Sequence, residues 1–335
     1  MPAGTRSCRV LRRALLAAVA LCGFGCDRLG PTPSSSPPSR SVPPPGATRS
    51  GGHEARSGPE DSGRWHSAET EHYVIHVEPG IPNRQADVEG RQLLLTLKGR
   101  MELLFRKYAL AFGVGGRLPA KATLNIYSSA AAYHAAGGPP GTAAYYNPRA
   151  KELVGCRENS QKVGLFQILC HEGCHQFFDL AFPGFYESDA IPMWFSEGLA
   201  DCFGASEVRG TELYVFTLTG LARLRVPRAR QAMEDHRRPS LKQLLEMDRT
   251  QFMSDAELNY ACSWSLVHFL WNAPSLDSGN GAYRSVVVRL IEGIRARKPR
   301  DELDRDAFQV AGAGLDLEKL DQQWDAYVRS LRARP

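Results

Sequence analysis

A short stretch from Cys170 to Phe178, CHEGCHQFF, contains residue types that can bind and use a metal ion. Each residue of an α-helix turns by roughly 100°, so His171 and His175 project from nearly the same face and can bind one ion together. Glu172 lies next to the first histidine, close enough to accept a proton from metal-activated water without being a ligand. The spacing therefore predicts a zinc site with Glu172 as its general base.

A third ligand is expected downstream, because a catalytic zinc ion usually takes three protein ligands and leaves the fourth position for water. The segment IPMWFSEGLADCFGA starts a second predicted helix near Pro192 and places Glu197 and Asp201 four residues apart on one face. If the two helices pack together, Glu197 can complete the ligand set. Asp201 can then accept a hydrogen bond from a ligand histidine and fix its tautomer.

The two segments together resemble the gluzincin zinc peptidases, whose second helix carries a glutamate ligand and an aspartate four residues later. In particular, the chain resembles a bacterial group of uncharacterised, often exported, peptidase-MA-like proteins. That group carries a tryptophan, an acid-Gly-Leu-Ala pattern and a later Ser-Trp segment, here Trp194, SEGLAD and YACSWSLVHFL. The resemblance extends from about Glu71 to Leu331. It implies a zinc peptidase in which His171, His175 and Glu197 are the metal ligands. Glu172 would be the base, and Asp201 would hydrogen-bond to a ligand histidine.

Hydrolysis of a peptide bond builds negative charge on the carbonyl oxygen, so a hydrogen-bond donor near the metal would help. Related peptidases place a tyrosine or histidine for this purpose well after the glutamate ligand. Tyr260 is the preferred candidate and His268 the second, although a tyrosine that anchors a helix in the core explains Tyr260 equally well. Tyr145 and Tyr146 are a third option, on a strand expected to border the cleft. Such an edge strand could also hold an extended substrate through backbone hydrogen bonds.

Five cysteines remain after the first 26 residues, namely Cys156, Cys170, Cys174, Cys202 and Cys262. An exported chain can form disulfides, but an odd number of cysteines leaves at least one free thiol. Cys170 and Cys174 share a helical face rotated from the histidines by roughly 60–100°. That position favours helix packing, or a disulfide from one of them to Cys202 or Cys262. A redox role is the weaker interpretation, because the chain has no C-x-x-C motif.

Two lobes are expected to position these residues within one catalytic domain over residues 65–335. Residues 65–158 predict a small sheet with one long helix, because apolar residues alternate in the strands and recur at helical spacing between them. His72 and His76 are expected on the exposed face of the first strand. The expected elements are a strand over Glu71–Pro79, a helix over Ala86–Phe112, a strand over Lys121–Ser129, and a hairpin over Thr142–Cys156 that turns at Asn147–Arg149.

Residues 159–335 predict a mostly helical, zincin-like body, interrupted by proline-rich and glycine-rich joints. Its first helix is expected over Ser160–Leu180, with Asn159 or Ser160 as the capping residue. A small mixed sheet followed by a helical body is an α+β fold.

The first 26 residues predict a secretion signal, with arginines followed by the apolar run Ala14–Gly25, too short to span a bilayer comfortably. The run ends in GFGC, which resembles a bacterial lipoprotein cleavage site, so Cys26 is expected to carry the lipid. Residues 27–64 are rich in proline, serine and glycine and cannot bury a core, which predicts a disordered tether. We therefore expect an exported protein held at a membrane of the bacterial cell envelope.

The net charge of +5 does not indicate a nucleic-acid partner, because four arginines lie in the signal segment and the remainder is close to neutral. The sequence predicts a zinc metallohydrolase, namely a peptidase that acts on extracytoplasmic protein or cell-wall peptide. One alternative is a non-catalytic envelope protein in which zinc only joins two helices. Another is a thiol-dependent redox protein. An open fourth coordination position distinguishes the enzyme from the structural zinc site.

Overall fold

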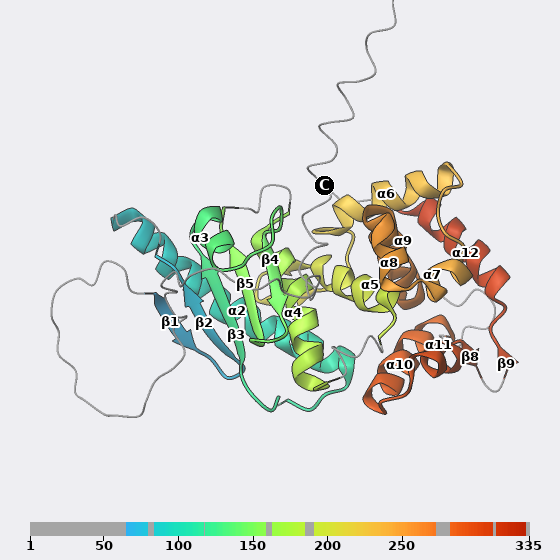
Figure 1. Cartoon of the computed structure of the whole chain (residues 1–335), viewed down its shortest axis with the longest axis horizontal. Helices are drawn as coiled ribbons and strands as arrows, with labels where there is room; N and C mark the ends of the chain where they lie inside the picture. The colour runs from blue at the N-terminus through green and yellow to red at the C-terminus, as the bar shows by residue number, and fades with distance from the viewer. Residues whose placement is uncertain are drawn as a thin grey trace, which may run out of the picture.

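The computed structural model describes residues 65–79, 84–116, 118–158, 163–184, 191–272, 282–310 and 313–332. The predicted signal sequence, Cys26 and the predicted tether lie outside the described residues. Figure 1 shows the sheet-bearing part, in blue to green, on one side and the helical part, in yellow to red, on the other. Within the described ranges, no helix combines the length and the apolar character needed to cross a bilayer.

The sheet is mixed and five-stranded, with the order β1-β2-β3-β5-β4. The three central strands run parallel, whereas each edge strand is antiparallel to its neighbour. On β2, Tyr73, Ile75 and Val77 are buried and alternate with half-buried residues, as the sequence predicts. The strands are β1 (His66–Glu69), β2 (Tyr73–Val77), β3 (Ala122–Tyr127), β4 (Ala144–Asn147) and β5 (Glu152–Cys156).

Helices cover both faces of this sheet. On one face lie α2 (Arg84–Phe112) and α4 (Leu165–Ala181), and on the other lies the short helix α3 (Ala130–Ala135). Neighbouring residues of β5 show the division, because Leu153 joins the large core shared with α2 and α4. Val154 instead belongs to a small cluster with Tyr133 of α3. A side chain on β4 or β5 therefore faces α4 only at every second position.

The helical body is built around α9 (Ala256–Asn272), which is buried at every position from Leu258 to Leu270. A helix that is buried all round occupies the centre of its domain. It packs against α5 (Met193–Gly204), α6 (Ala222–Glu234), α10 (Ala282–Arg295) and α12 (Leu317–Ser330). The remaining elements are β6 (Glu207–Arg209), β7 (Glu212–Tyr214), α7 (Leu241–Glu246), α8 (Arg249–Ser254), α11 (Arg300–Ala307), β8 (Gln309–Val310) and β9 (Ala313–Gly314).

The α+β prediction is confirmed, with a mixed sheet followed by a helical body. The structure adds β1, α3 and the two-stranded sheets β6–β7 and β8–β9, which the sequence did not predict. The predicted start of the helix at Ser160 is wrong, because α4 begins at Leu165. Gly164 precedes it with an extended backbone and offers no side-chain cap. Asn159 and Ser160, the expected capping residues, lie outside the described residues.

Helices α5 and α9 approach each other closely at Gly198, between Glu197 and Asp201 in the sequence. A Cβ atom at this position would lie only 2.5 Å from the backbone oxygen of Ser263 on α9. Real Cβ atoms do not approach backbone oxygen so closely, so the glycine is required for this contact. The depth at which α5 sits in the protein, and with it the position of Glu197, therefore depends on a residue without a side chain.

We predict that Gly198→Ala destabilises the protein by about 1–3 kcal/mol, because the added methyl group must push α5 away from α9. Gly99→Ala is the matched control, since Gly99 lies in α2 and a methyl group added there would have nothing within 4 Å. The control should instead stabilise the protein by up to about 1 kcal/mol through helix propensity. Urea unfolding measures both, and equal effects of the two variants would contradict the packing argument.

Candidate metal centre

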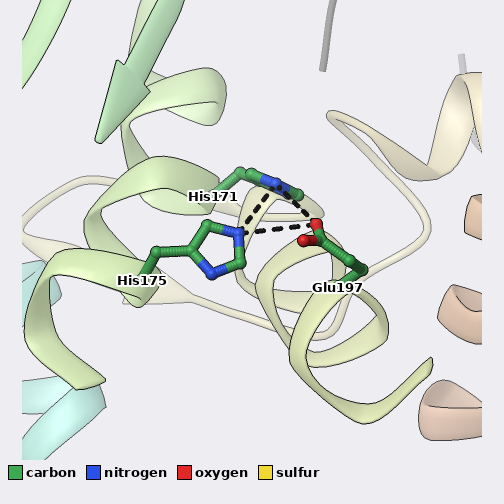
Figure 2. Close-up of side chains that lie close together, drawn as sticks. All are labelled: His171, His175 and Glu197. Carbon is green, nitrogen blue, oxygen red and sulfur yellow. Dashed lines mark hydrogen bonds and ion pairs between the residues drawn. The ribbon is translucent and has the colours of Figure 1, made fainter. Parts of the chain in front are cut away.

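Three side chains from two helices meet in the interior of the protein. Figure 2 shows His171 and His175 of α4 and Glu197 of α5 pointing toward one another. The Nε2 atoms of the two histidines are 3.3 Å apart. Glu197 Oε2 lies 3.4 Å from Nε2 of His171 and 3.5 Å from Nε2 of His175. The three donor atoms thus form a nearly equilateral triangle.

The spacing of this triangle fits a metal ion. In a tetrahedral site with metal–ligand distances of about 2.0–2.1 Å, neighbouring ligand atoms are about 3.3–3.4 Å apart. The three residues are only 1%, 3% and 4% exposed, in sequence order. Glu197 Oε2 is buried and accepts no hydrogen bond. A buried carboxylate oxygen without a hydrogen bond is costly, and a cation bound by the three atoms would remove that cost.

The buried charged groups of the site shift one another's pKa values. Burial opposes ionisation of Glu197, but the neighbouring His175 and His171 outweigh it and hold the pKa of this carboxyl far below its ordinary value. Glu172 shows the opposite balance, because burial raises its pKa and the two histidines only partly offset the rise. One Glu172 oxygen, Oε2, accepts a hydrogen bond of 3.1 Å from the backbone N–H of Tyr146 on β4.

Asp201 holds the ring of His171. The Nδ1 of His171 lies 2.9 Å from Asp201 Oδ1, and because a carboxylate can only accept, the histidine donates. Burial disfavours the charged ring, but Asp201 and Glu197 outweigh burial and raise the pKa of His171, so a bound cation would take the place of the proton on Nε2. A second interaction, which the sequence gives no spacing signal to predict, comes from Arg225 on α6. Its Nε and Nη2 donate to Asp201 at 2.6 and 3.2 Å.

Among the candidates for the oxyanion role, Tyr260 has a ring contact with a residue of the triad. Its ring centroid is 6.5 Å from that of His171. The guanidinium carbon of Arg225 lies 5.0 Å from the centre of the Tyr260 ring, and Phe252 packs edge-on against the same ring. One arginine therefore contacts both Asp201 and Tyr260.

The other oxyanion candidates lie elsewhere or are engaged. His268 packs against Trp264, and its Nδ1 lies 2.8 Å from the hydroxyl of Tyr327. Burial lowers the pKa of His268 to about 4. Tyr145 belongs to the cluster on the opposite face of the sheet. The hydroxyl of Tyr146 donates to Asp179, a residue of α4 that the sequence analysis did not single out.

All five cysteines of the described chain are buried thiols outside any disulfide, so the disulfides considered from the sequence do not form. Burial raises the pKa of the Cys170 and Cys262 thiols to about 12. Only thiolates react readily, so these residues act as small core side chains. Cys170, Cys174, Cys202 and Cys262 belong to the large core that contains α4, α5 and α9, whereas Cys156 packs in the small cluster with Tyr133.

A second group of histidine and carboxylates, near the start of β2, behaves differently from the triad. His72 donates from Nδ1 to Glu102 Oε2 at 2.7 Å and from Nε2 to the carbonyl of Gly116 at 2.8 Å. Neither acceptor carries a hydrogen, so both ring nitrogens are protonated and neither can bind a metal. The expectation of an exposed His72 is wrong, because the ring stacks on Phe105. His72 is a charged link between the sheet, α2 and the loop that follows.

Comparison with known proteins places the triad in a segment shared with a family, without assigning an activity. Residues 166–276 match a family described as a protein of unknown function, DUF1570. The matched segment is about a third of the chain and runs from α4 past the end of α9. It includes the three triad residues, Glu172, Asp201 and Tyr260. No curated protein matches the chain.

We predict that the stability contributed by His72 is lost at alkaline pH. Burial opposes its charge, but the bonds to Glu102 and Gly116 outweigh burial and raise the pKa of the ring. The contribution is therefore fully present below about pH 6.5, the ordinary pKa, and disappears as the pH rises through the higher pKa of the folded state. His72→Gln should lower the free energy of unfolding by about 1–2 kcal/mol at pH 6 and by less at pH 9. Thermal unfolding across this range measures the difference, and a loss that is independent of pH would contradict it.

We also predict that Asp201→Asn lowers the metal affinity of the triad, measured with zinc as the probe ion, by about 10–100-fold, because the charged acceptor that orients His171 is lost. Competition with a chromophoric chelator measures the affinity. Asp235→Asn, at the exposed end of α6, is the control and should bind zinc like the wild type. Equal affinities in Asp201→Asn and the control would remove Asp201 from its role.

Proposed function

We propose that the protein is a zinc-dependent peptidase that cleaves peptide bonds with activated water. The observation that carries this proposal is the triangle of His171, His175 and Glu197 beside the carboxylate of Glu172. Two histidines and a glutamate are a ligand set of catalytic zinc sites. Zinc in such a site lowers the pKa of a coordinated water to about 7 and polarises a carbonyl oxygen.

Glu172 is the proposed general base. It follows His171 directly in α4, and the hydrogen bond from Tyr146 N–H fixes its Oε2. The other carboxylate oxygen can then take a proton from water and pass it to the leaving amine. Burial raises the pKa of Glu172, which moves it toward the operating pH at which a general base works best.

The edge of the sheet supports a peptide as the substrate. The N–H of Cys156 donates to the carbonyl of Ala143, and bonded pairs alternate along an antiparallel ladder. By this alternation Tyr145 bonds to β5, whereas the backbone groups of Ala144 and Tyr146 point away from it. Tyr146 N–H reaches Glu172, so the edge of β4 that faces away from β5 lies on the side of the proposed base. Ala144 and Tyr146 are only 1% and 0% exposed, so an extended peptide could pair with this edge only after the residues that cover it move.

Tyr260 is the proposed donor to the carbonyl oxygen of the substrate. Its ring is held near His171 by Arg225 on one face and by the edge contact with Phe252. A donor fixed in this way needs no reorganisation as charge develops on the oxygen. Tyr260 would therefore act on the reacting group, whereas Arg225 would act through Asp201 and Tyr260.

The place of action proposed from the sequence is outside the cytoplasm. The support is the secretion signal and the lipoprotein-like GFGC segment ending at Cys26. A lipid on Cys26 and a tether of residues 27–64 would hold the peptidase near a membrane of the bacterial envelope. Its substrates would then be extracytoplasmic proteins or cell-wall peptides.

A structural zinc site in a non-catalytic envelope protein is the second candidate function. The low exposure of the triad, at most 4% for each residue, favours it. The two functions differ in the need for Glu172, because a structural site requires the ligands but not a base.

We predict that Glu172→Gln binds zinc within about twofold of the wild type but hydrolyses fluorescently labelled casein at least about 100-fold more slowly. Glutamine keeps the shape and can accept the bond from Tyr146 N–H, but it cannot take the proton. Glu197→Ala should instead lose zinc, and with it hydrolysis. Zinc content by mass spectrometry and casein cleavage give the two readouts. Hydrolysis retained in Glu172→Gln, or wild-type protein that binds no zinc, contradicts the proposal.

A further inference from the structure

Asp179 is a charged residue in the interior beside the triad. It lies one helical turn after His175 in α4, and its side chain is 0% exposed. Its Oδ2 accepts hydrogen bonds from the hydroxyl of Tyr146 on β4 and from Nζ of Lys151, at 2.6 Å, in the turn before β5. Helix α4 is thereby joined to strand β4 and to the turn that precedes β5.

Tyr146 contacts α4 at two points. Its backbone N–H donates to Glu172, and its hydroxyl donates to Asp179. These two helix residues are seven positions apart, which is about two turns or about 10 Å along the helix axis. A strand residue held at two such distant points cannot slide along the helix or rotate about the strand without breaking one bond. The hydroxyl anchor therefore fixes where the N–H lies.

The turn that carries Lys151 is tied to the same helix by its backbone. Gln176 Nε2 donates to the carbonyl of Lys151 at 3.1 Å and to that of Thr123 on β3 at 2.8 Å. Lys151 itself has a φ of 59°, in the left-handed region that non-glycine residues rarely adopt. The turn thus accepts an unfavourable backbone conformation while Nζ of Lys151 reaches Asp179.

The position of Asp179 is unfavourable for helix stability. It lies in the last turn of α4, where the helix dipole disfavours negative charge. In addition, Oδ1 is buried without a hydrogen bond. A buried pair of this kind is weak evidence for stabilisation. Its geometry, by contrast, explains how the edge strand keeps its place along α4.

We propose that Asp179, Tyr146 and Lys151 form a positioning unit that holds the N–H of Tyr146 on Oε2 of Glu172. The unit fixes edge strand β4 along α4, so that the base is oriented and the edge of β4 that faces away from β5 lies on the side of the base. Its effect on catalysis rests on the proposed peptidase function. Its effect on the strand is a property of the fold and can be measured without any activity.

Tyr146→Phe tests the proposal by removing only the hydroxyl. Amide hydrogen exchange of the segment containing β4 should become about tenfold faster, because the strand loses a charge-assisted hydrogen bond. Zinc affinity should stay within twofold of the wild type, since no ligand is touched. With labelled casein as the substrate, kcat should fall about tenfold and KM should change less than twofold. Tyr133→Phe is the matched control, since it removes a buried phenolic bond, to Thr142, on the opposite face of the sheet.

Asp179→Asn provides a second route to the same interaction. Asparagine keeps the shape and one acceptor, so exchange and kcat should move in the same direction as in Tyr146→Phe, by a smaller factor. The fold-changes of the two single variants should combine to less than their product in the double variant, because both changes act on the shared Tyr146–Asp179 bond, although Asp179→Asn also weakens the contact with Lys151. If the fold-changes in exchange and kcat of the two single variants multiply in the double variant, Tyr146 and Asp179 act separately, and the proposed unit is overturned.

The readouts separate this proposal from the proposed function. Faster exchange with unchanged zinc affinity supports the positioning unit even if the wild type does not cleave casein, and in that case only the peptidase function fails. Unchanged exchange in Tyr146→Phe overturns the unit, whatever the activity. A loss of zinc affinity in Tyr146→Phe also overturns it, because the hydroxyl would then support the ligand helix itself. The same changes in Tyr133→Phe would show a general loss of stability and overturn it as well.

Discussion

Two imidazoles and a carboxylate lie within 3.5 Å of one another in an interior that water hardly reaches, and such an arrangement opposes folding. Removing charged and polar groups from water is costly, and their mutual attraction offsets the cost only when the geometry is good. Much of the surrounding structure supplies that geometry. Asp201 accepts from one imidazole, and Arg225 in turn neutralises Asp201. A cation shared by the three donor atoms would complete the balance.

The supporting shell comes from parts of the chain that are distant in sequence. The first helix of the triad is joined to the sheet by Gln176 and Asp179, and the second lies directly against the backbone of α9 at Gly198. Helix α6 adds Arg225, which also lies over Tyr260. Each of these contacts restricts a helix in a different direction. Together they hold the two helices so that donor atoms on separate segments meet at the spacing of a metal site.

The sequence was sufficient to predict those features that depend on local spacing. Residues four apart on a helix share a face whatever the tertiary structure, so the pairing of His171 with His175 and of Glu197 with Asp201 followed from the sequence. The strands β2 and β3 and the β4–β5 hairpin followed from alternation and turn residues. Arg225 and Asp179 could not be found in this way, because their partners lie at no fixed separation in the chain. His72 was misjudged for the same reason, since its acceptors lie 30 and 44 residues away.

Burial of five thiols that form no disulfide has a consequence for how the chain reaches its native state. Each of these sulfur atoms belongs to a residue that is at most 1% exposed, so oxidants meet none of them once the helices have packed. The unfolded chain lacks this protection, and in an oxidising medium any two cysteines can then cross-link in a non-native way. Closure of the α4, α5 and α9 interfaces therefore shields four of these thiols from oxidants, and the packing of α3 on the sheet shields Cys156.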